Sequence, residues 1–150
     1  MIALLFGVAG QRYGLDVSQV LEVVPAVRLR AIAGVPDFVA GIFRYKGAIV
    51  PVLDLNQMLS GKPAEKRYST RIVLVRYPGQ TGAEQVLGLL VEGADQGLTD
   101  SLSELQSSGI ATPDFPVLGK LASLGNETIQ FVRTEQLIPE ALRERLFPED

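Results

Sequence analysis

The sequence of 150 residues contains no cysteine, no histidine and no tryptophan. Without cysteine, the chain cannot form a disulfide scaffold, a thiolate metal site or a cysteine nucleophile. Without histidine, it lacks the usual zinc ligand, the base of a Ser-His-Asp triad and a phosphohistidine site. We therefore expect no catalytic residue, no metal and no cofactor.

Positive charge is also in short supply. The 14 Lys and Arg against 17 Asp and Glu give a net charge of −3, whereas nucleic-acid-binding domains are usually basic. Residues 1–75 carry nine basic and five acidic side chains and residues 76–150 carry five and twelve, so the halves bear +4 and −7. This polarity either steers a partner of complementary charge or reflects solvated faces. We expect no nucleic-acid partner.

Long hydrophobic runs are absent, although 47% of the residues are hydrophobic. The longest apolar run is far shorter than the ~20 residues that span a bilayer. Met1–Val8 is apolar but lacks the basic region that opens a secretory signal. We expect a cytoplasmic protein with a real core and no direct membrane insertion.

What the chain does contain is 15 glycines and nine prolines spread between short β-rich runs. Many short strands separated by turn signals favour an all-β barrel or a pair of small barrels. The strands expected are Ile2–Val8, Arg12–Val17, Ile42–Tyr45, Ala48–Leu55, Arg71–Tyr77, Gln85–Val91, Ala94–Leu98 and Asn126–Arg133. Short helices are expected at Ser18–Val24, Pro36–Gly41, Leu55–Leu59 and Pro139–Leu146, and loops at Lys62–Ser69 and Ser107–Pro116.

Three details of the strand pattern predict local geometry. The apolar run from Ile72 to Val75 predicts one strand of a hairpin that is buried on both faces. Pro51 cannot donate to a ladder, so we expect it at a sheet edge or a bulge. Gly88 inside a strand predicts a bulge or a close backbone approach.

Three carboxylates, Asp16, Glu22 and Asp54, are the main candidates for acid–base or Mg²⁺ chemistry. The sequence has no Asp-x-Asp spacing and neither glycine-rich phosphate motif. Turn or capping roles are the simpler interpretation of these side chains.

A basic, tyrosine-containing set of residues resembles in composition a surface for single-stranded nucleic acid. The chain has only ten Tyr and Phe in all, which argues against a stacking surface. The set comprises Arg44, Tyr45, Lys46, Lys62, Lys66, Arg67, Tyr68 and Arg71.

The segment Gly41–Leu55 combines a glycine turn, a basic residue at that turn and a strand blunted by proline, which favours a docking surface. From Val39 to Leu55 it resembles the motif V-x-G-hydrophobic-x-N-L-R-G-x-I-V-P-V-hydrophobic-D-L of the CheW-like coupling proteins of bacterial chemosensory arrays. Arg44-Tyr45-Lys46 stands where that motif has Asn-Leu-Arg, so an ammonium replaces a guanidinium.

Two further regions carry the same resemblance. Tyr13–Val17 followed by Val20–Val23 is similar to the family's Y-A-L-x-V…V-x-E-V segment. Ile72–Val75 and Gly88–Glu92 are similar to its later hydrophobic strands. The order is kept through nearly the whole chain.

The resemblance implies a mainly β fold of two small intertwined five-stranded SH3-like barrels with a few short helices and a hydrophobic groove between the barrels. It implies one domain over residues 1–150, made of two barrel subdomains. The implied function is that of a non-enzymatic adaptor, which couples the cytoplasmic tip of a chemoreceptor to the regulatory domain of a CheA-type histidine kinase at membrane-associated arrays.

Site residues follow position by position from the same resemblance. The kinase-facing turn is assigned to Gly41, Lys46 and Gly47, with Arg44 as the nearest guanidinium. The receptor-facing segment is assigned to Val20, Glu22 and Val23. Each residue also has a structural interpretation: backbone geometry for the glycines, core packing for the valines and solvation for Glu22.

Two other classes of function remain open from the sequence. One is a small-molecule-binding β-barrel module or barrel enzyme that uses the groove between the barrels. The other is a nucleic-acid-binding barrel.

Overall fold

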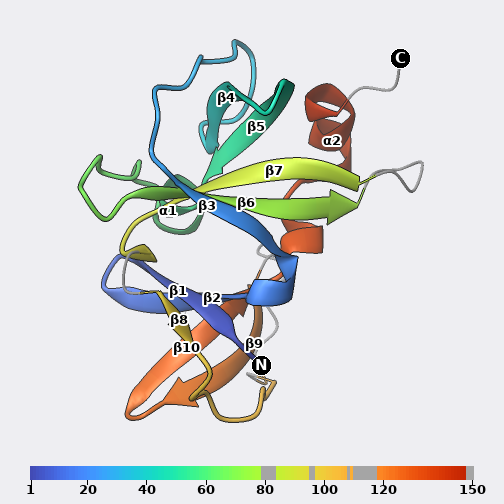
Figure 1. Ribbon diagram of the computed structural model, residues 1–150. Helices are drawn as coiled ribbons and strands as arrows, with labels where there is room; N and C mark the ends of the chain where they lie inside the picture. The colour runs from blue at the N-terminus through green and yellow to red at the C-terminus, as the bar shows by residue number, and fades with distance from the viewer. Residues whose placement is uncertain (79–83, 95–96, 108, 110–117, 148–150) are drawn as a thin grey trace.

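The computed structural model describes residues 1–78, 84–94, 97–107, 109 and 118–147, which form two five-stranded sheets (Figure 1). The terminal sheet takes its strands from the two ends of the chain, in the order β8 (Leu98–Thr99), β1 (Ala3–Val8), β2 (Gln11–Asp16), β10 (Glu127–Val132) and β9 (Leu118–Leu124). The middle sheet has the order β3 (Val20–Pro25), β6 (Arg71–Pro78), β7 (Glu84–Val91), β5 (Ala48–Asp54) and β4 (Val39–Tyr45).

Short helices join or follow these strands. They are the 3₁₀ turns η1 (Val17–Gln19) and η3 (Thr134–Gln136) and the α-helices α1 (Leu55–Ser60) and α2 (Glu140–Leu146). No helix in the described part of the chain is long and apolar enough to cross a membrane.

The chain leaves the terminal sheet after β2, builds the whole middle sheet and then returns (Figure 1). The predicted mainly β fold with two intertwined five-stranded units is therefore confirmed. In each sheet an antiparallel hairpin lies beside a parallel neighbour, β2 beside β10 and β7 beside β5. The two sheets thus share one strand arrangement.

Three hydrophobic clusters hold the sheets. The largest, which we call the shared cluster, joins side chains of both sheets, such as Phe6 and Leu15 with Val73 and Leu89. A second cluster belongs to the terminal sheet and a third to the middle sheet. Each sheet therefore buries both faces.

Strand β6 shows how this comes about. Val73, Val75 and Tyr77 point into the shared cluster, whereas Ile72 and Leu74 point into the cluster of the middle sheet. Alternate side chains leave opposite faces of a strand. The prediction of a hairpin strand that is buried on both faces is confirmed.

Most strands and two of the helices lie within a few residues of their predicted positions. The two helices are α1 and α2, predicted at Leu55–Leu59 and Pro139–Leu146. The loop predicted at Lys62–Ser69 is present and mostly exposed. Strand β9 was not predicted, and most of the loop predicted at Ser107–Pro116 lies outside the described residues.

Two predicted helices are wrong, and one predicted strand falls partly outside the described residues. In the strand expected over Ala94–Leu98, Ala94 and Gly97 are not extended, Leu98 begins β8, and residues 95–96 are not described. The segment Pro36–Gly41 contains turns and the start of β4, not a helix. The helix expected over Ser18–Val24 is instead η1 followed by β3.

The β3 error has an identifiable cause. The register between β3 and β6 shifts between Val20 and Glu22, so an extra residue, Leu21, bulges from the strand. A bulge adds one residue to the period of two. Val20 and Val23 therefore share a face at a spacing of three, which mimics a helical pattern.

Pro51 and Gly88 meet beside the parallel pair of the middle sheet. β5 is an interior strand, so the edge position expected for Pro51 is wrong, but its ladder with β7 begins only at Val52. A Cβ at Gly88 would meet Val52 Cγ2 at 3.0 Å and Ile72 Cγ2 at 3.1 Å. The close approach at Gly88 is therefore made by side chains, since the nearest backbone atom, Pro51 O, would lie 3.5 Å from that Cβ.

Candidate functional site

The hairpin that joins β4 to β5 presents the basic turn. Tyr45 and Ala48 form its last strand pair, and Lys46 and Gly47 are the two turn residues, with φ angles of 47° and 81°. Two positive φ angles are the mark of a type I′ turn, whose twist matches that of the flanking strands. Both turn residues are exposed, so a partner can reach the predicted turn.

Aromatic packing fixes the direction of the Lys46 side chain. Its ammonium lies 5.3 Å from the centre of the Tyr45 ring, a cation–π contact worth roughly 0.5–1 kcal/mol at an exposed site. The centre of the Tyr45 ring lies 6.3 Å from the centre of the Phe43 ring, and both rings pack against the cluster of the middle sheet. The charge is thus held at a defined place.

Arg44 leaves the hairpin on the opposite face. It pairs with Ile49 across the ladder, and both side chains are exposed. Neighbouring residues on a strand point in opposite directions, so Arg44 points away from the Tyr45 ring and from Lys46. The two cations therefore mark two faces of one hairpin, and Ile49, 53% exposed, adds apolar surface to the Arg44 face.

Gly41 lies at the other end of β4 and is buried. Its φ is +147°, and a Cβ there would lie 2.5 Å from the backbone oxygen of Arg30. Gly41 is therefore required by a close backbone approach. Any part that it has in binding is indirect, through the position of the hairpin.

The predicted receptor-facing residues lie on β3, at one edge of the middle sheet. Val20 and Val23 face the shared cluster, opposite Val75 and Val73, and Glu22 faces the other side, opposite Leu74. Val20 is partly buried, whereas Val23 is 40% exposed. Glu22 is exposed on a strand, not on a helix.

β3 and β4 form opposite edges of the middle sheet. The structure therefore separates the two predicted contact regions and does not join them into one site. Such a separation allows two partners to be held at once.

Sequence reasoning missed the exposed apolar side chain of Leu21 on β3, which is 41% exposed. Leu21 was assigned to a helix, and alternation alone does not reveal a bulge. Tyr68 is 99% exposed and lies in the loop that was predicted over Lys62–Ser69.

The carboxylates proved to be caps in two cases. Asp16 Oδ1 accepts a hydrogen bond from Ser18 N at 2.9 Å. Asp54 is buried, and its two oxygens accept from Gln57 N at 3.0 Å and from Ala64 N at 2.9 Å. The predicted capping roles of Asp16 and Asp54 are confirmed. Among the described residues, no group of three or more acidic side chains is placed to hold a metal ion.

The basic and tyrosine residues belong to two separate segments of the fold. Arg44, Tyr45 and Lys46 lie on the β4–β5 hairpin, and the others lie in the loop after α1 and at the start of β6. In that loop Arg67 Nε donates to Glu65 Oε2 at 2.7 Å, and this bond raises the pKa of Arg67.

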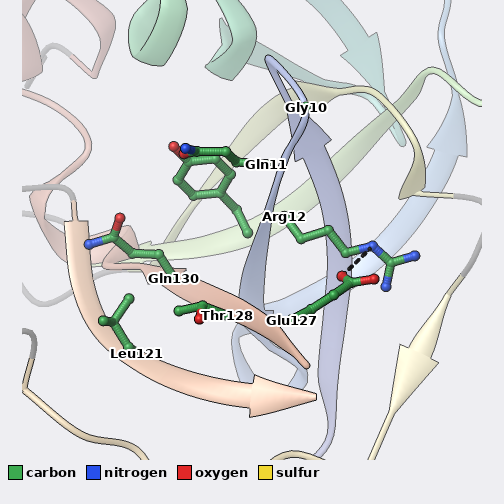
Figure 2. A pocket seen from close by; sticks show the side chains of 8 residues that line it. Gly10, Gln11, Arg12, Leu121, Glu127, Thr128 and Gln130 are labelled. Carbon is green, nitrogen blue, oxygen red and sulfur yellow. Dashed lines mark ion pairs between the residues drawn. The ribbon is translucent and has the colours of Figure 1, made fainter. Parts of the chain in front are cut away.

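A shallow hollow of about 520 Å³ lies on the terminal sheet (Figure 2). Arg12 Nε lies 3.4 Å from Glu127 Oε2 on one side of β2, while Gln11 and Gln130 lie on the other. Burial raises the pKa of Tyr13, which also lines this hollow. The hollow lies on one sheet, away from both predicted contact regions.

The contact between the sheets is a packed core in the described part of the chain. The shared cluster places buried side chains of both sheets against each other, including Leu4, Tyr13, Leu53 and Leu87. A smaller hollow of about 470 Å³ lies where Ala9 of the terminal sheet approaches α1 and the loop after it. The apolar side chains that the resemblance placed around a groove are thus largely used for packing.

The CheW-like domain family model matches residues 3–142. The chain is similar to the chemotaxis protein CheW of Klebsiella aerogenes, with 25% identity over 141 residues that cover 90% of this chain and 80% of that protein. It is also similar to protein FrzA of Myxococcus xanthus, with 36% identity over 87 residues that cover 56% and 54% of the two chains.

A solved structure gives the same relationship. The scaffolding protein TtCheW from Thermoanaerobacter tengcongensis matches with a TM-score of 0.75 and 26% identity, over 89% of this chain and 84% of that one. This match confirms the predicted fold class. The comparisons support a chemotaxis coupling adaptor and do not support a small-molecule or nucleic-acid module. Because the family model spans nearly the whole sequence, the chain belongs to the CheW-like domain family.

Proposed function

We propose that the chain is a non-enzymatic adaptor that couples the cytoplasmic tip of a chemoreceptor to the regulatory domain of a CheA-type histidine kinase. The observation that carries the proposal is the family match over residues 3–142, whose central motif folds as an exposed basic hairpin. We further propose that residues 1–150 act as one domain of two barrel subdomains. Its place is in the cytoplasm, at membrane-associated receptor arrays.

The β4–β5 hairpin is the proposed kinase contact. Lys46 and Arg44 supply two exposed cations on different faces, and Gly47 allows the tight turn. Charges at an interface rim mainly set the rate and orientation of association. Gly41 contributes by fixing the strand that carries them.

The β3 strand is the proposed receptor contact. Val23 offers an exposed apolar side chain and Glu22 an exposed charge, while Val20 anchors the strand in the shared cluster. Each contact is small, below or near ~800 Å² per partner, so each is expected to be reversible. Repetition in an array then supplies strength through effective concentration.

The kinase contact is tested with Lys46→Glu and, as a matched control, Lys66→Glu, another exposed lysine on the middle subdomain. Lys46→Glu is expected to raise the Kd for a kinase regulatory domain about tenfold, or about 1.4 kcal/mol, mainly through slower association. Lys66→Glu is expected to leave both binding and the thermal melt unchanged. Lys46→Glu is expected to lower stability only by the roughly 0.5–1 kcal/mol of its lost contact with Tyr45. Unchanged binding by Lys46→Glu would remove the kinase assignment.

The receptor contact is tested with Val23→Lys against Val27→Lys. The parent side chains are 40% and 43% exposed, so the two changes are similar in their effect on solvation. Only Val23→Lys is expected to weaken binding of a receptor tip fragment, by about tenfold or more if Val23 lies near the centre of the contact. Equal effects of the two variants would contradict the assignment to β3.

A further inference from the structure

The two sheets have four edge strands, and within the described residues three of them are covered or very short. The outer side of β4 pairs with Arg30, through Arg30 N to Ile42 O and Ile42 N to Arg30 O, both at 2.9 Å. The outer side of β9 pairs with Gln106, through two hydrogen bonds of 2.7 and 2.8 Å with Leu121. β8 has only two residues.

The fourth edge, β3, is different. It has six residues, and over the described residues its only ladder is the one with β6. An edge strand presents unpaired backbone N–H and C=O groups along its outer side. Proteins protect such an edge with lysine, proline, a bulge or a short strand. β3 carries no lysine, has proline only at its last position, Pro25, and has its bulge at Leu21, near the start of the strand, so Glu22–Val24 form a regular stretch of edge.

The side chains of β3 also favour pairing. Leu21 and Val23 are exposed apolar residues in the middle of the strand, and Glu22 is its one charged residue. Val23 and Glu22 point to opposite faces, as their partners on β6 show. A strand added outside β3 would therefore place neighbouring residues beside Val23 on one face and beside Glu22 on the other.

We propose that the open edge of β3 accepts an extended segment of a partner protein by backbone pairing. The segment that fits carries an apolar side chain beside Val23 and a lysine or arginine beside Glu22. The middle sheet then becomes six-stranded. Main-chain hydrogen bonds supply affinity in this mode, and alternate side chains supply specificity. The inference rests on the proposed function, because it assigns the mode by which β3 engages one of the two coupled partners.

The test is hydrogen exchange at single amides, measured on the full chain alone and with a saturating receptor tip fragment or kinase regulatory domain in turn. Backbone pairing is expected to slow exchange at least tenfold at alternate β3 amides, because in an extended strand every second N–H points outward. The amide of Ile42 serves as a control, since it is already bonded to Arg30 O and should not change. Binding measured in the same samples tests the proposed function separately.

A second variant separates backbone pairing from side-chain contact. Proline placed in Glu22–Val24, at the residue whose amide exchanges fastest in the free chain, removes an outward donor and leaves the ladder with β6 intact. It is expected to weaken binding about tenfold while the thermal melt stays near that of the parent.

Three results would overturn the inference. In the first, a fragment binds but no alternate protection appears on β3, which leaves the proposed coupling function standing. In the second, neither fragment protects β3 at all. In the third, protection grows with the concentration of the chain alone, which would make a second copy the occupant.

Discussion

The terminal and middle sheets share one strand arrangement and differ in charge and in their edges. Residues 20–91, which include every strand of the middle sheet, carry nine basic and five acidic side chains, or +4. The remaining residues, 1–19 and 92–150, carry five and twelve, or −7. The polarity read along the sequence is therefore also a polarity between the two halves of the fold.

The terminal and middle sheets also differ in the length of their edge strands. β8 and β3 occupy equivalent places, each beside the first strand of a hairpin, yet β8 has two residues and β3 has six. Both proposed contact regions, the β4–β5 hairpin and β3, belong to the middle sheet. One strand arrangement, used twice, therefore has a six-residue edge strand in the middle sheet where the terminal sheet has one of two residues.

The largest predicted effect concerns the shared cluster. Leu15 of the terminal sheet and Leu89 of the middle sheet are both fully buried in it. Leu15→Ala and Leu89→Ala are each expected to lower the free energy of unfolding by about 2–5 kcal/mol. Urea unfolding followed by circular dichroism and by tyrosine fluorescence should show one common transition.

Ile49→Ala is the control, because its parent side chain is exposed, and it should change stability by less than about 0.5 kcal/mol. Two separate transitions in either core variant would break the comparison, since the sheets would then be independent units.

The second prediction compares equivalent glycines. Gly41 lies in β4, which pairs with β5, and Gly119 lies in β9, which pairs with β10. Each glycine lies beside a shift in the register of its strand pair. A Cβ at Gly41 would meet the rigid backbone of Arg30 at 2.5 Å, whereas one at Gly119 would first meet the Arg133 side chain at 2.9 Å.

Gly41→Ala is therefore expected to cost about 3 kcal/mol and Gly119→Ala about 1 kcal/mol. Chemical denaturation of both variants measures the difference. Equal losses would mean that the two bulges are alike, in conflict with the geometry at Arg30.

The third prediction compares the residues at the ends of two equivalent strands, Asp54, the last residue of β5, and Arg133, the residue after β10. Asp54 caps α1 and also binds Ala64 N, whereas Arg133, which precedes η3, makes no capping hydrogen bond. Asp54→Ala is expected to cost about 2 kcal/mol, because it leaves two backbone donors without their acceptor. Arg133→Ala should cost less than about 0.5 kcal/mol. Thermal melts of the pair provide the measurement, and a smaller loss at Asp54 than at Arg133 would refute it.

The smallest effect is a pH dependence of stability that arises from one residue of the terminal sheet, Tyr13. Burial raises the pKa of Tyr13 above its ordinary value of 10.0 in the folded chain. The unfolded chain then loses this proton first, so stability is full below pH 10 and falls as the pH rises further. Tyr13→Phe is expected to flatten this fall above about pH 10, as measured by the urea midpoint. A fall equally steep in the variant would assign it to other groups.

The sequence was most informative where a strand is buried on both faces or a helix carries its own cap. The run Ile72–Val75 is apolar at every position because the strand contacts two hydrophobic clusters, so the sequence predicted the hairpin. Asp54 followed by Leu55–Leu59 predicted the capped helix α1. Prediction failed at β3, because the bulge at Leu21 converts a strand pattern into a helical one. It also missed β9, whose short apolar spacing is interrupted by Gly119 and Lys120.

The candidate site was located in outline only. The turn at Lys46 followed from its own sequence, since Lys46-Gly47 stands between two apolar runs. The opposite directions of Arg44 and Lys46 and the burial of Gly41 depend on Tyr45 and on Arg30, which local patterns do not connect to them. The open edge of β3 is a property of what lies beside it, and no single segment contains that information.

The path of the chain through the two sheets also fixes an order of synthesis. β2 ends at Asp16, while its parallel neighbour β10 begins at Glu127. At translation rates of roughly 5–20 residues per second, the first hairpin waits on the order of 6–20 seconds for that neighbour. In that interval the ribosome synthesises every strand of the middle sheet. The middle sheet is therefore the first surface against which the β1–β2 hairpin can pack.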